Sequence, residues 1–163
     1  MIVSIVGSPD SGKTTLIETV VPLLKQRGLR VAVVKHHAHG DFSFDREGKD
    51  SWRFYNRGAD VLVVCPGKLA MVRRTGENEY SLDYVYERFL KDKYDIVLTE
   101  GFNSAGKDRI VVLNPSDNIE RLRKGKIMAV VCERDLPDYK TFRLKEEDFR
   151  EIAEMIAEKL KSQ

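Results

Sequence analysis

The residues with the clearest chemical meaning lie near the N-terminus, where positions 7–14 read GSPDSGKT. This stretch matches G-x-x-x-x-G-K-[ST] at every fixed position, and it lies between an apolar run and a helical pattern. In such a loop, backbone N–H groups surround a phosphate, and the helix N-terminus adds its positive end. The pattern predicts a nucleotide-binding loop of eight residues: Gly7, Ser8, Pro9, Asp10, Ser11, Gly12, Lys13 and Thr14.

Within this loop, three side chains have distinct expected roles. We expect Lys13 to reach the β- and γ-phosphates and the Thr14 hydroxyl to join the ligands of a Mg²⁺ ion. Asp10 is unexpected, because it places a carboxylate near bound phosphates. The sequence leaves open whether Asp10 faces away or orients a water molecule or a substrate group.

A second acidic candidate is Glu100, at the end of the apolar run 96–100. Open α/β sheets bind ligands at the carboxyl ends of their strands, and P-loop proteins hold Mg²⁺ partly through an acidic residue there. We therefore expect Glu100 to bind Mg²⁺ directly or through water. Asp95, at the opposite end of the run, is expected to be a solvated or capping residue.

All three histidines fall in one short segment, as His36, His37 and His39. They fit a metal site, a cationic cradle for a second phosphorylated ligand, or a polar loop whose histidines cap backbone groups. The absence of a paired ligand set such as C-x₂-C weighs against zinc. The charged segment continues to Arg53, at the place where P-loop proteins carry their γ-phosphate-sensing switch, which favours a functional role.

The elements that must position these residues alternate along the chain. Apolar runs throughout the strands, interleaved with helical patterns, indicate a mainly parallel sheet covered on both faces. We expect an α/β, three-layer P-loop NTPase fold with strands at 2–6, 30–35, 95–99, 109–113 and 127–132, and helices at 14–27, 50–57, 81–91 and 146–160.

The runs 61–65 and 69–73 flank a Pro-Gly turn and predict an antiparallel hairpin at one edge of that sheet. If the chain dimerises, this hairpin is our candidate surface, because a sheet edge needs covering. Cys65 and Cys132 each end an apolar run and are expected to be buried strand residues.

Length and charge narrow the classes of function. The 163 residues fit one domain, 1–163. With 28 basic and 26 acidic residues, the net charge of +2 gives no reason to expect nucleic acid or a membrane surface as a partner. No apolar run approaches the ~20 residues of a membrane span, and the first residues lack the features of a signal peptide. We therefore expect a cytoplasmic protein.

Three segments together resemble the MobB family, molybdopterin-guanine dinucleotide biosynthesis protein B. They are GSPDSGKTTL (7–16), KHHAHGDFSFDREGKDSWRFYNRGAD (35–60) and DIVLTEGF (95–102), and the likeness covers nearly the whole chain in order and spacing. The resemblance implies a small, dimeric, GTP- and Mg²⁺-binding protein with weak GTPase activity. It also implies an accessory role beside the nucleotidyltransferase MobA, in attaching a guanine nucleotide to molybdenum cofactor, with molybdopterin as a bound substrate.

The resemblance also adds Thr15 to the nucleotide-binding loop and suggests roles for residues outside the loop. Lys13, Asp45 and Glu100 become the catalytic candidates, and Glu133 or Asp135 becomes the carboxylate that pairs with guanine. The preference for guanine over adenine is implied by the resemblance alone, since the chain has no N-K-x-D motif. The residues expected near the γ-phosphate or the incoming cofactor are Lys35, His36, His39 and Arg53. Relatives carry a basic residue and a P-K pair after the EGF sequence, a place that Lys107 or Arg109 could fill here.

Two other functions stay open. A small-molecule kinase would need an acceptor-activating base, which Asp41 or Asp45 could supply, and a lid, for which the cluster 121–124 is a candidate if it is not an ordinary solvated face. A metallochaperone-type regulatory GTPase would use the histidines for a metal. In a weak GTPase, Arg53 or Arg73 could supply a cation in trans across a dimer.

Overall fold

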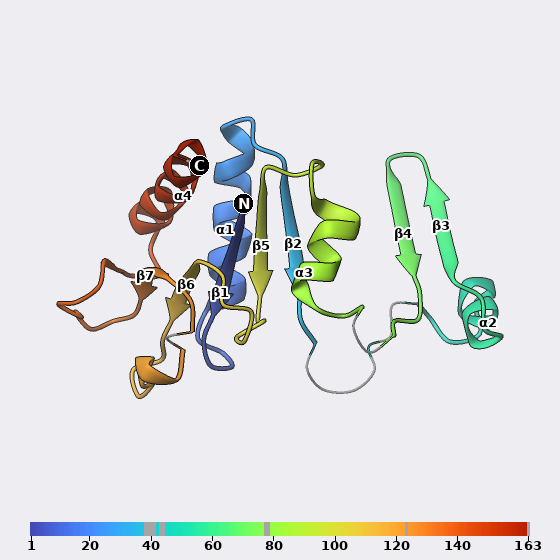
Figure 1. Cartoon of the computed structure of the whole chain (residues 1–163), viewed down its shortest axis with the longest axis horizontal. Helices are drawn as coiled ribbons and strands as arrows, with labels where there is room; N and C mark the ends of the chain where they lie inside the picture. Colours follow the sequence, from blue (N-terminus) through green and yellow to red (C-terminus); the bar gives the residue numbers. More distant parts are fainter. Residues whose placement is uncertain (38–41, 43–44, 77–78, 123, 163) are drawn as a thin grey trace. The chain divides into compact units, whose positions relative to one another are not determined.

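The structure is a computed structural model, and it describes residues 1–37, 42, 45–76, 79–122 and 124–162 (Figure 1). The chain forms two compact units, one made of Met1–His36 with Tyr86–Gln163 and the other of His37–Val85. The first unit carries the phosphate loop. The second contains a hairpin with short helices.

The first unit is built on a six-stranded sheet in the order β2-β5-β1-β6-β7-β8, in which every described strand pair is parallel. The first five of these strands are labelled in Figure 1. This arrangement confirms the predicted α/β fold with a mainly parallel sheet. The strand β1 lies between β5 and β6, so the loop that follows β1 opens near the middle of the sheet. The strands are β1 (Ile2–Val6), β2 (Val31–Lys35), β5 (Ile96–Glu100), β6 (Arg109–Val112), β7 (Ile127–Val131) and β8 (Thr141–Phe142).

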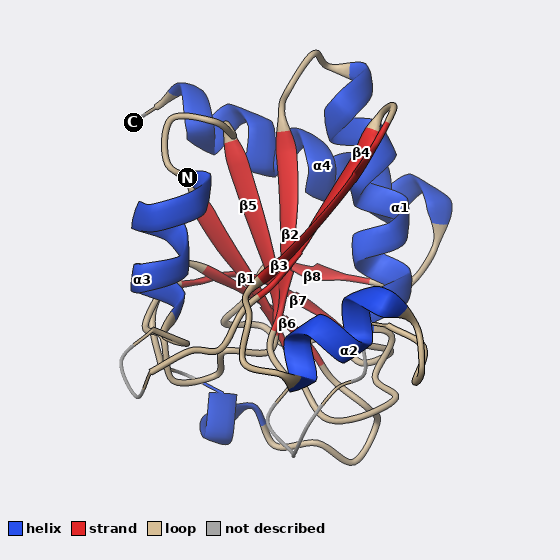
Figure 2. Cartoon of the chain, turned by 90° about the vertical axis from the view of Figure 1, so that its right-hand side faces the viewer, coloured by secondary structure: helices blue, strands red, loops and turns tan. Residues whose placement is uncertain are grey.

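The central strands of this sheet, β5, β1, β6 and β7, are mostly buried on both faces, which explains why they are apolar at consecutive positions. The helices α1 (Lys13–Gln26) and α4 (Glu146–Lys161) cover one face together (Figure 2). Alternate strand residues such as Val3 and Leu98 point into that layer. The opposite face carries a smaller apolar cluster around Val111 and Val130, which the short 3₁₀ helix Ile119–Leu122 helps to cover.

The second unit contains α2 (Asp50–Asn56), β3 (Val61–Cys65), β4 (Lys68–Val72) and α3 (Leu82–Val85). The strands β3 and β4 form the predicted antiparallel hairpin. They form a two-stranded sheet of their own, however, and within the described residues they are not an edge of the six-stranded sheet. Cys65 is exposed rather than buried, which corrects that expectation, whereas Cys132 is buried as predicted.

The segment predicted as one helix over 81–91 changes its winding part of the way along. The helix α3 is followed by a π-helical turn, Tyr86–Leu90, in which the amide of Lys91 donates to the carbonyl of Tyr86 at 2.8 Å. Ser81 caps the start as expected, with its hydroxyl accepting from the amide of Tyr84 at 3.2 Å. In the described parts of the chain, no helix is long and apolar enough to cross a lipid bilayer.

Candidate nucleotide site

The phosphate loop needs its two glycines because other groups approach their backbones closely. A Cβ atom at Gly7 would lie 2.1 Å from the carbonyl oxygen of Val112. At Gly12, which has a left-handed φ of 95°, a Cβ atom would lie 2.5 Å from a methyl group of Leu144. Neither position can accept a side chain without moving its neighbours, and this fixes the path of the loop between β1 and α1.

The loop surrounds a hollow of about 460 Å³. Its lining combines backbone and side chains of the loop with residues from two other strand ends, Lys35 and Glu100. The size suits a small-molecule site, and its walls are the residues that the sequence pattern indicated. The lining residues are Pro9, Asp10, Ser11, Gly12, Lys13, Thr14, Thr15, Lys35 and Glu100.

Glu100 is the residue on which the polar contacts of the hollow converge. One carboxylate oxygen accepts a hydrogen bond from the Thr14 hydroxyl at 3.0 Å, and the other lies 3.3 Å from the Nζ atom of Lys35. The side chain of Glu100 is 16% exposed, so it is held in place and still reaches the hollow. The structure thus brings together the predicted residues of α1, β2 and β5.

These oxygens have the chemistry that Mg²⁺ requires. A hydroxyl and a carboxylate oxygen 3.0 Å apart are hard ligands, and Mg²⁺ usually completes its shell with water and substrate phosphates. Thr14 and Glu100 therefore fit the ion. Among the described residues, no group of three or more His, Cys, Asp or Glu side chains is arranged to hold a metal ion.

Two side chains of the loop, Lys13 and Ser11, differ in how their polar groups are satisfied. The ammonium group of Lys13 donates to the carbonyl of Ser8 at 2.5 Å, so it folds back over its own loop. Ser11 is buried, and its hydroxyl has no hydrogen-bond partner within the described part of the chain. A phosphate in the hollow would give the Lys13 ammonium a stronger acceptor than a carbonyl.

His36 follows β2 next to this hollow, and His36 is not one of its lining residues. Its amide donates to the carbonyl of Glu100 at 2.9 Å, and its ring lies 4.6 Å from the ring of Phe102. Phe102 has a left-handed φ of 54° directly after Gly101. The histidine thus fixes the turn that follows Glu100. His39 lies outside the described residues.

Asp45 and Arg53 belong to the second unit, and their described contacts are with α2. The Asp45 carboxylate accepts hydrogen bonds from the hydroxyl of Ser51 and the amide of Arg46, and these bonds lower its pKa. The amide of Trp52, in the first turn of α2, also donates to Asp45, so Asp45 holds this turn although Lys49 is the N-cap residue. A carboxylate with a lowered pKa is a weak general base. Arg53 forms an exposed ion pair with Asp50 at 3.9 Å.

Arg109, a candidate for the basic residue expected after the EGF sequence, lies inside the protein. Its side chain is completely buried, and its Nη1 atom donates to the carbonyls of Asn103 at 3.2 Å and Leu122 at 3.0 Å. Burial lowers the pKa of this guanidinium. Arg109 holds two loops together and does not present its charge to a ligand.

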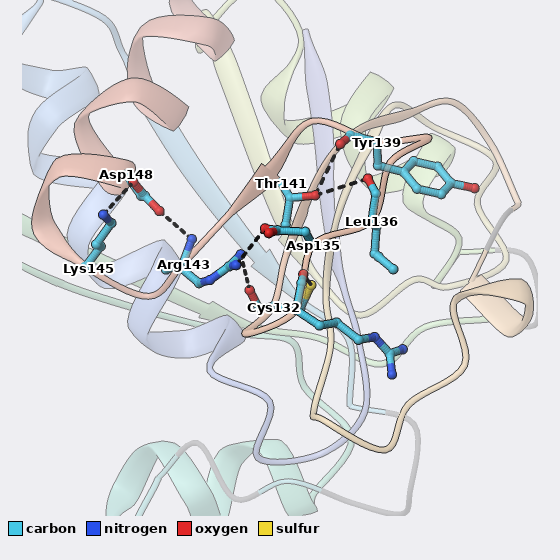
Figure 3. A network of polar contacts seen from close by, with 9 residues as sticks. Cys132, Asp135, Leu136, Tyr139, Thr141, Arg143, Lys145 and Asp148 are labelled. Atoms are coloured by element: carbon cyan, nitrogen blue, oxygen red, sulfur yellow. Dashed lines mark hydrogen bonds and ion pairs between the residues drawn. The ribbon is translucent and has the colours of Figure 1, made fainter.

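The acidic candidates for base recognition lie in the loop after β7. Arg143 donates to the carboxylate of Asp135 and to the carbonyl of Cys132, both at 2.8 Å, and the amide of Arg143 donates to Asp148 (Figure 3). Glu133 is exposed in the same loop. Asp135 is thus bonded to Arg143, and the next residue, Leu144, contacts Gly12 of the phosphate loop.

Sequence reasoning missed Arg143, Leu144 and Asn114. Arg143 and Leu144 follow β8, a strand of two residues that is too short to show a hydrophobic pattern. Asn114 donates its side-chain amide to the carbonyl of Pro9 at 3.2 Å, across more than 100 positions of sequence. Of these three, Asn114 carried the single available signal, because it follows a predicted strand at the ligand-binding edge.

The parallel sheet and the loop that opens α1 define this chain as a P-loop nucleotide-binding α/β protein. The family model described as "Molybdopterin guanine dinucleotide synthesis protein B" (MobB) matches residues 2–133. The chain therefore belongs to the MobB family.

Relatives and solved structures agree with this assignment. The chain is 35% identical over 111 residues to the molybdopterin-guanine dinucleotide biosynthesis adapter protein of Haemophilus influenzae, covering 68% of this chain and 62% of that protein, or less than two thirds of its length. It is 32% identical to a probable adapter protein of Bacillus subtilis, covering 82% of this chain and 76% of that one. A crystal structure of molybdopterin-guanine biosynthesis protein B superposes with a TM-score of 0.85 at 50% identity, covering 99% of both chains.

Proposed function

We propose that this chain binds GTP and Mg²⁺ in the hollow of the phosphate loop and acts as an accessory protein in converting molybdopterin cofactor to its guanine dinucleotide form. The observation that carries the proposal is the convergence of Thr14, Lys35 and Glu100 beside the loop. The names of the related adapter proteins supply the pathway.

In this proposal, each part of the hollow has one role. Backbone N–H groups of residues 10–14 and the start of α1 surround the phosphates, and Lys13 turns from the Ser8 carbonyl to the β- and γ-phosphates. Thr14 and Glu100 hold Mg²⁺, which would neutralise phosphate charge. Lys35, which is paired with Glu100, provides a second cation at the same edge.

The base lies toward the loops after β7 and β8. Either Glu133 or Asp135 would accept from the guanine N1–H and amino groups. The bond from Arg143 occupies one oxygen of Asp135 and leaves the other free for such a contact. Leu144, which is 41% exposed beside Gly12, gives the nucleoside an apolar surface.

Hydrolysis is at most slow, because a fast GTPase needs a group that orients the attacking water. Asp45 is poorly suited to this role, since its lowered pKa makes it a weak base. The described residues that line the hollow include no histidine and no arginine. An arginine supplied by a second copy, Arg53 or Arg73, would stabilise the transition state.

A second copy of the chain is expected at the hairpin of the second unit. One face of β3 and β4 carries four exposed aliphatic side chains that lie in two cross-strand pairs, Leu62 with Met71 and Val64 with Leu69. An apolar patch of this kind on a two-stranded sheet needs a cover. We propose a homodimer at this hairpin in the cytoplasm, beside a MobA-like guanylyltransferase as the enzyme partner and molybdopterin as the bound substrate.

Calorimetry with GTP, GDP and ATP in the presence of Mg²⁺ tests the nucleotide proposal. Binding of GTP should disappear in Lys13→Ala and stay unchanged in Lys25→Ala, which removes an exposed lysine from the last turn of the same helix. Tight binding of ATP with poor binding of GTP would contradict the proposal. Comparing the nucleoside diphosphate formed with the free phosphate released, in the presence of a small-molecule acceptor, tests for kinase activity. Phosphoryl transfer to the acceptor forms the diphosphate without free phosphate, whereas hydrolysis forms both in equal amounts.

A further inference from the structure

Asp10 is the one charged residue of the phosphate loop to which the proposed site gives no role. It lies between Gly7 and Gly12, it is exposed, and it lines the hollow. Its φ of 57° is in the left-handed region, where Asp and Asn are more common than most other residues. No hydrogen bond or ion pair joins its carboxylate to another residue within the described ranges.

The charges around the hollow balance. Its charged lining residues are two lysines, Lys13 and Lys35, and two acids, Asp10 and Glu100. Lys35 is paired with Glu100 at 3.3 Å, which leaves the formal charges of Asp10 and Lys13, and these also sum to zero. A polyphosphate that enters the hollow therefore meets no net positive charge from the lining side chains, and its attraction rests on backbone N–H groups, the start of α1 and a metal ion.

We propose that Asp10 lowers the affinity of this site for nucleotides by electrostatic repulsion, so that tight binding requires Mg²⁺ to neutralise the phosphates. This inference rests on the proposed nucleotide binding. Asp10 thereby sets how strongly the site discriminates between a Mg²⁺-bound and a metal-free nucleotide. By the same repulsion, an anion at this point favours release of the nucleotide.

The test compares Asp10→Asn with Asp92→Asn. Asparagine keeps the shape of the side chain and tolerates the same backbone conformation, so the substitution removes charge and little else. Asp92 is a matched control, because it is exposed, has a left-handed φ of 63° and is not a lining residue of the hollow. Asp10→Gly is a second variant, since glycine accepts this conformation without a side chain.

Binding of GTP and GDP is measured by calorimetry, with Mg²⁺ and with EDTA, at low and high salt. We expect Asp10→Asn and Asp10→Gly to bind metal-free GTP about tenfold more tightly than the wild type at low ionic strength. The gain should be smaller with Mg²⁺, and it should shrink at ~1 M salt, where the Debye length falls to ~3 Å. Asp92→Asn should bind like the wild type.

The results that would contradict this inference differ from those that would contradict the proposed function. If the wild type binds GTP and Asp10→Asn binds equally well or more weakly, Asp10 is not repulsive, and nucleotide binding itself still stands. Weaker binding of Asp10→Asn in Mg²⁺ alone would make Asp10 part of the metal shell and would overturn the inference. If neither the wild type nor any Asp10 variant binds a nucleotide, the proposed function fails and the inference fails with it.

Discussion

The two units of this chain bury apolar side chains to very different extents. In the first unit, residues such as Val3, Leu98 and Ile110 are fully buried in a core shared by the sheet and two helices. In the second unit, Leu82 is the single buried hydrophobic residue among those described. Eight of the ten exposed large hydrophobic side chains of the described chain also lie in that unit.

The first unit therefore has a complete hydrophobic core of its own, and the second unit does not. The parallel sheet of the first unit has layers on both faces, so burying its strands stabilises it without a partner. The hairpin of the second unit pairs its backbone groups and leaves aliphatic side chains in solvent. The first unit contains the hollow of the phosphate loop, in which we propose nucleotide binding. Because exposed apolar patches often mark interaction surfaces, we propose the hairpin of the second unit as the surface for association.

Charging the hairpin is expected to have the largest effect. The double variant Val64→Glu with Leu69→Glu places two carboxylates on the aliphatic face, where an interface would have to desolvate them. Dimerisation should weaken at least about a hundredfold, measured by light scattering across a dilution series. Lys68→Glu, at the tip of the hairpin, should remain dimeric, and nucleotide binding should persist in both proteins. A wild type that is monomeric at all concentrations would contradict this prediction.

Matched leucine truncations compare the two units directly. Leu98→Ala removes a fully buried side chain and should reduce the free energy of unfolding by about 2–5 kcal/mol. Leu62→Ala removes a side chain that is 58% exposed, and in dilute, monomeric protein it should cost less than about 0.5 kcal/mol. Urea unfolding at low protein concentration measures both. Equal losses would mean that the hairpin is buried within a single chain.

Within the first unit, we expect Glu100 to raise the affinity for GTP by binding Mg²⁺. Glu100→Gln removes the carboxylate charge and keeps a side chain of similar shape beside Thr14. The gain in GTP affinity that Mg²⁺ provides should fall about tenfold, measured as the ratio of Kd values with Mg²⁺ and with EDTA. Asp95→Asn, before the opposite end of the same strand, should leave that ratio unchanged. An equal change in both variants would refute a specific role for Glu100.

The smallest effect concerns Asp95 and acid stability. Hydrogen bonds from the side chain and the backbone of Arg30 hold the pKa of Asp95 at about 2. Because the folded pKa lies below the unfolded value of about 4, the stabilisation is fully present above pH ~4 and is lost as the pH falls toward 2. The difference in unfolding free energy between the wild type and Asp95→Asn should therefore shrink over that range, measured by urea titrations at successive pH values.

Much of the first unit could be predicted from the sequence because its signals are local. The phosphate loop has fixed residue types, and fully buried strands read as continuous apolar runs, so β1 matched its prediction and β5 was shifted by one residue. Lys35 and Glu100 were predicted at the site because the carboxyl ends of parallel strands meet at one edge. Elements that require a regular pattern of residue types, such as this loop and these buried strands, can therefore be predicted from the sequence.

The remaining features depended on contacts that no pattern records. The strand β3 is as apolar as β7, so the sequence did not distinguish the exposed Cys65 from the buried Cys132. The bond between Arg143 and Asp135 joins loops on either side of a strand of two residues. The role of Asp45 in holding the first turn of α2 depends on the particular start of that helix, which the charged segment alone did not specify.

The order of strands in the sheet has a consequence for the newly made chain. The strand β1 pairs with β5 and β6, which are synthesised much later. Val3 can therefore pair only after Leu98 has been made, and Ile5 can pair with Ile110 only after that residue has been made. A ribosome therefore releases the complete hairpin, residues 61–72, before the phosphate loop acquires either of its flanking strands. During synthesis, the aliphatic hairpin and an unpaired β1 are therefore exposed at the same time, and exposed apolar surface and unpaired strands favour aggregation.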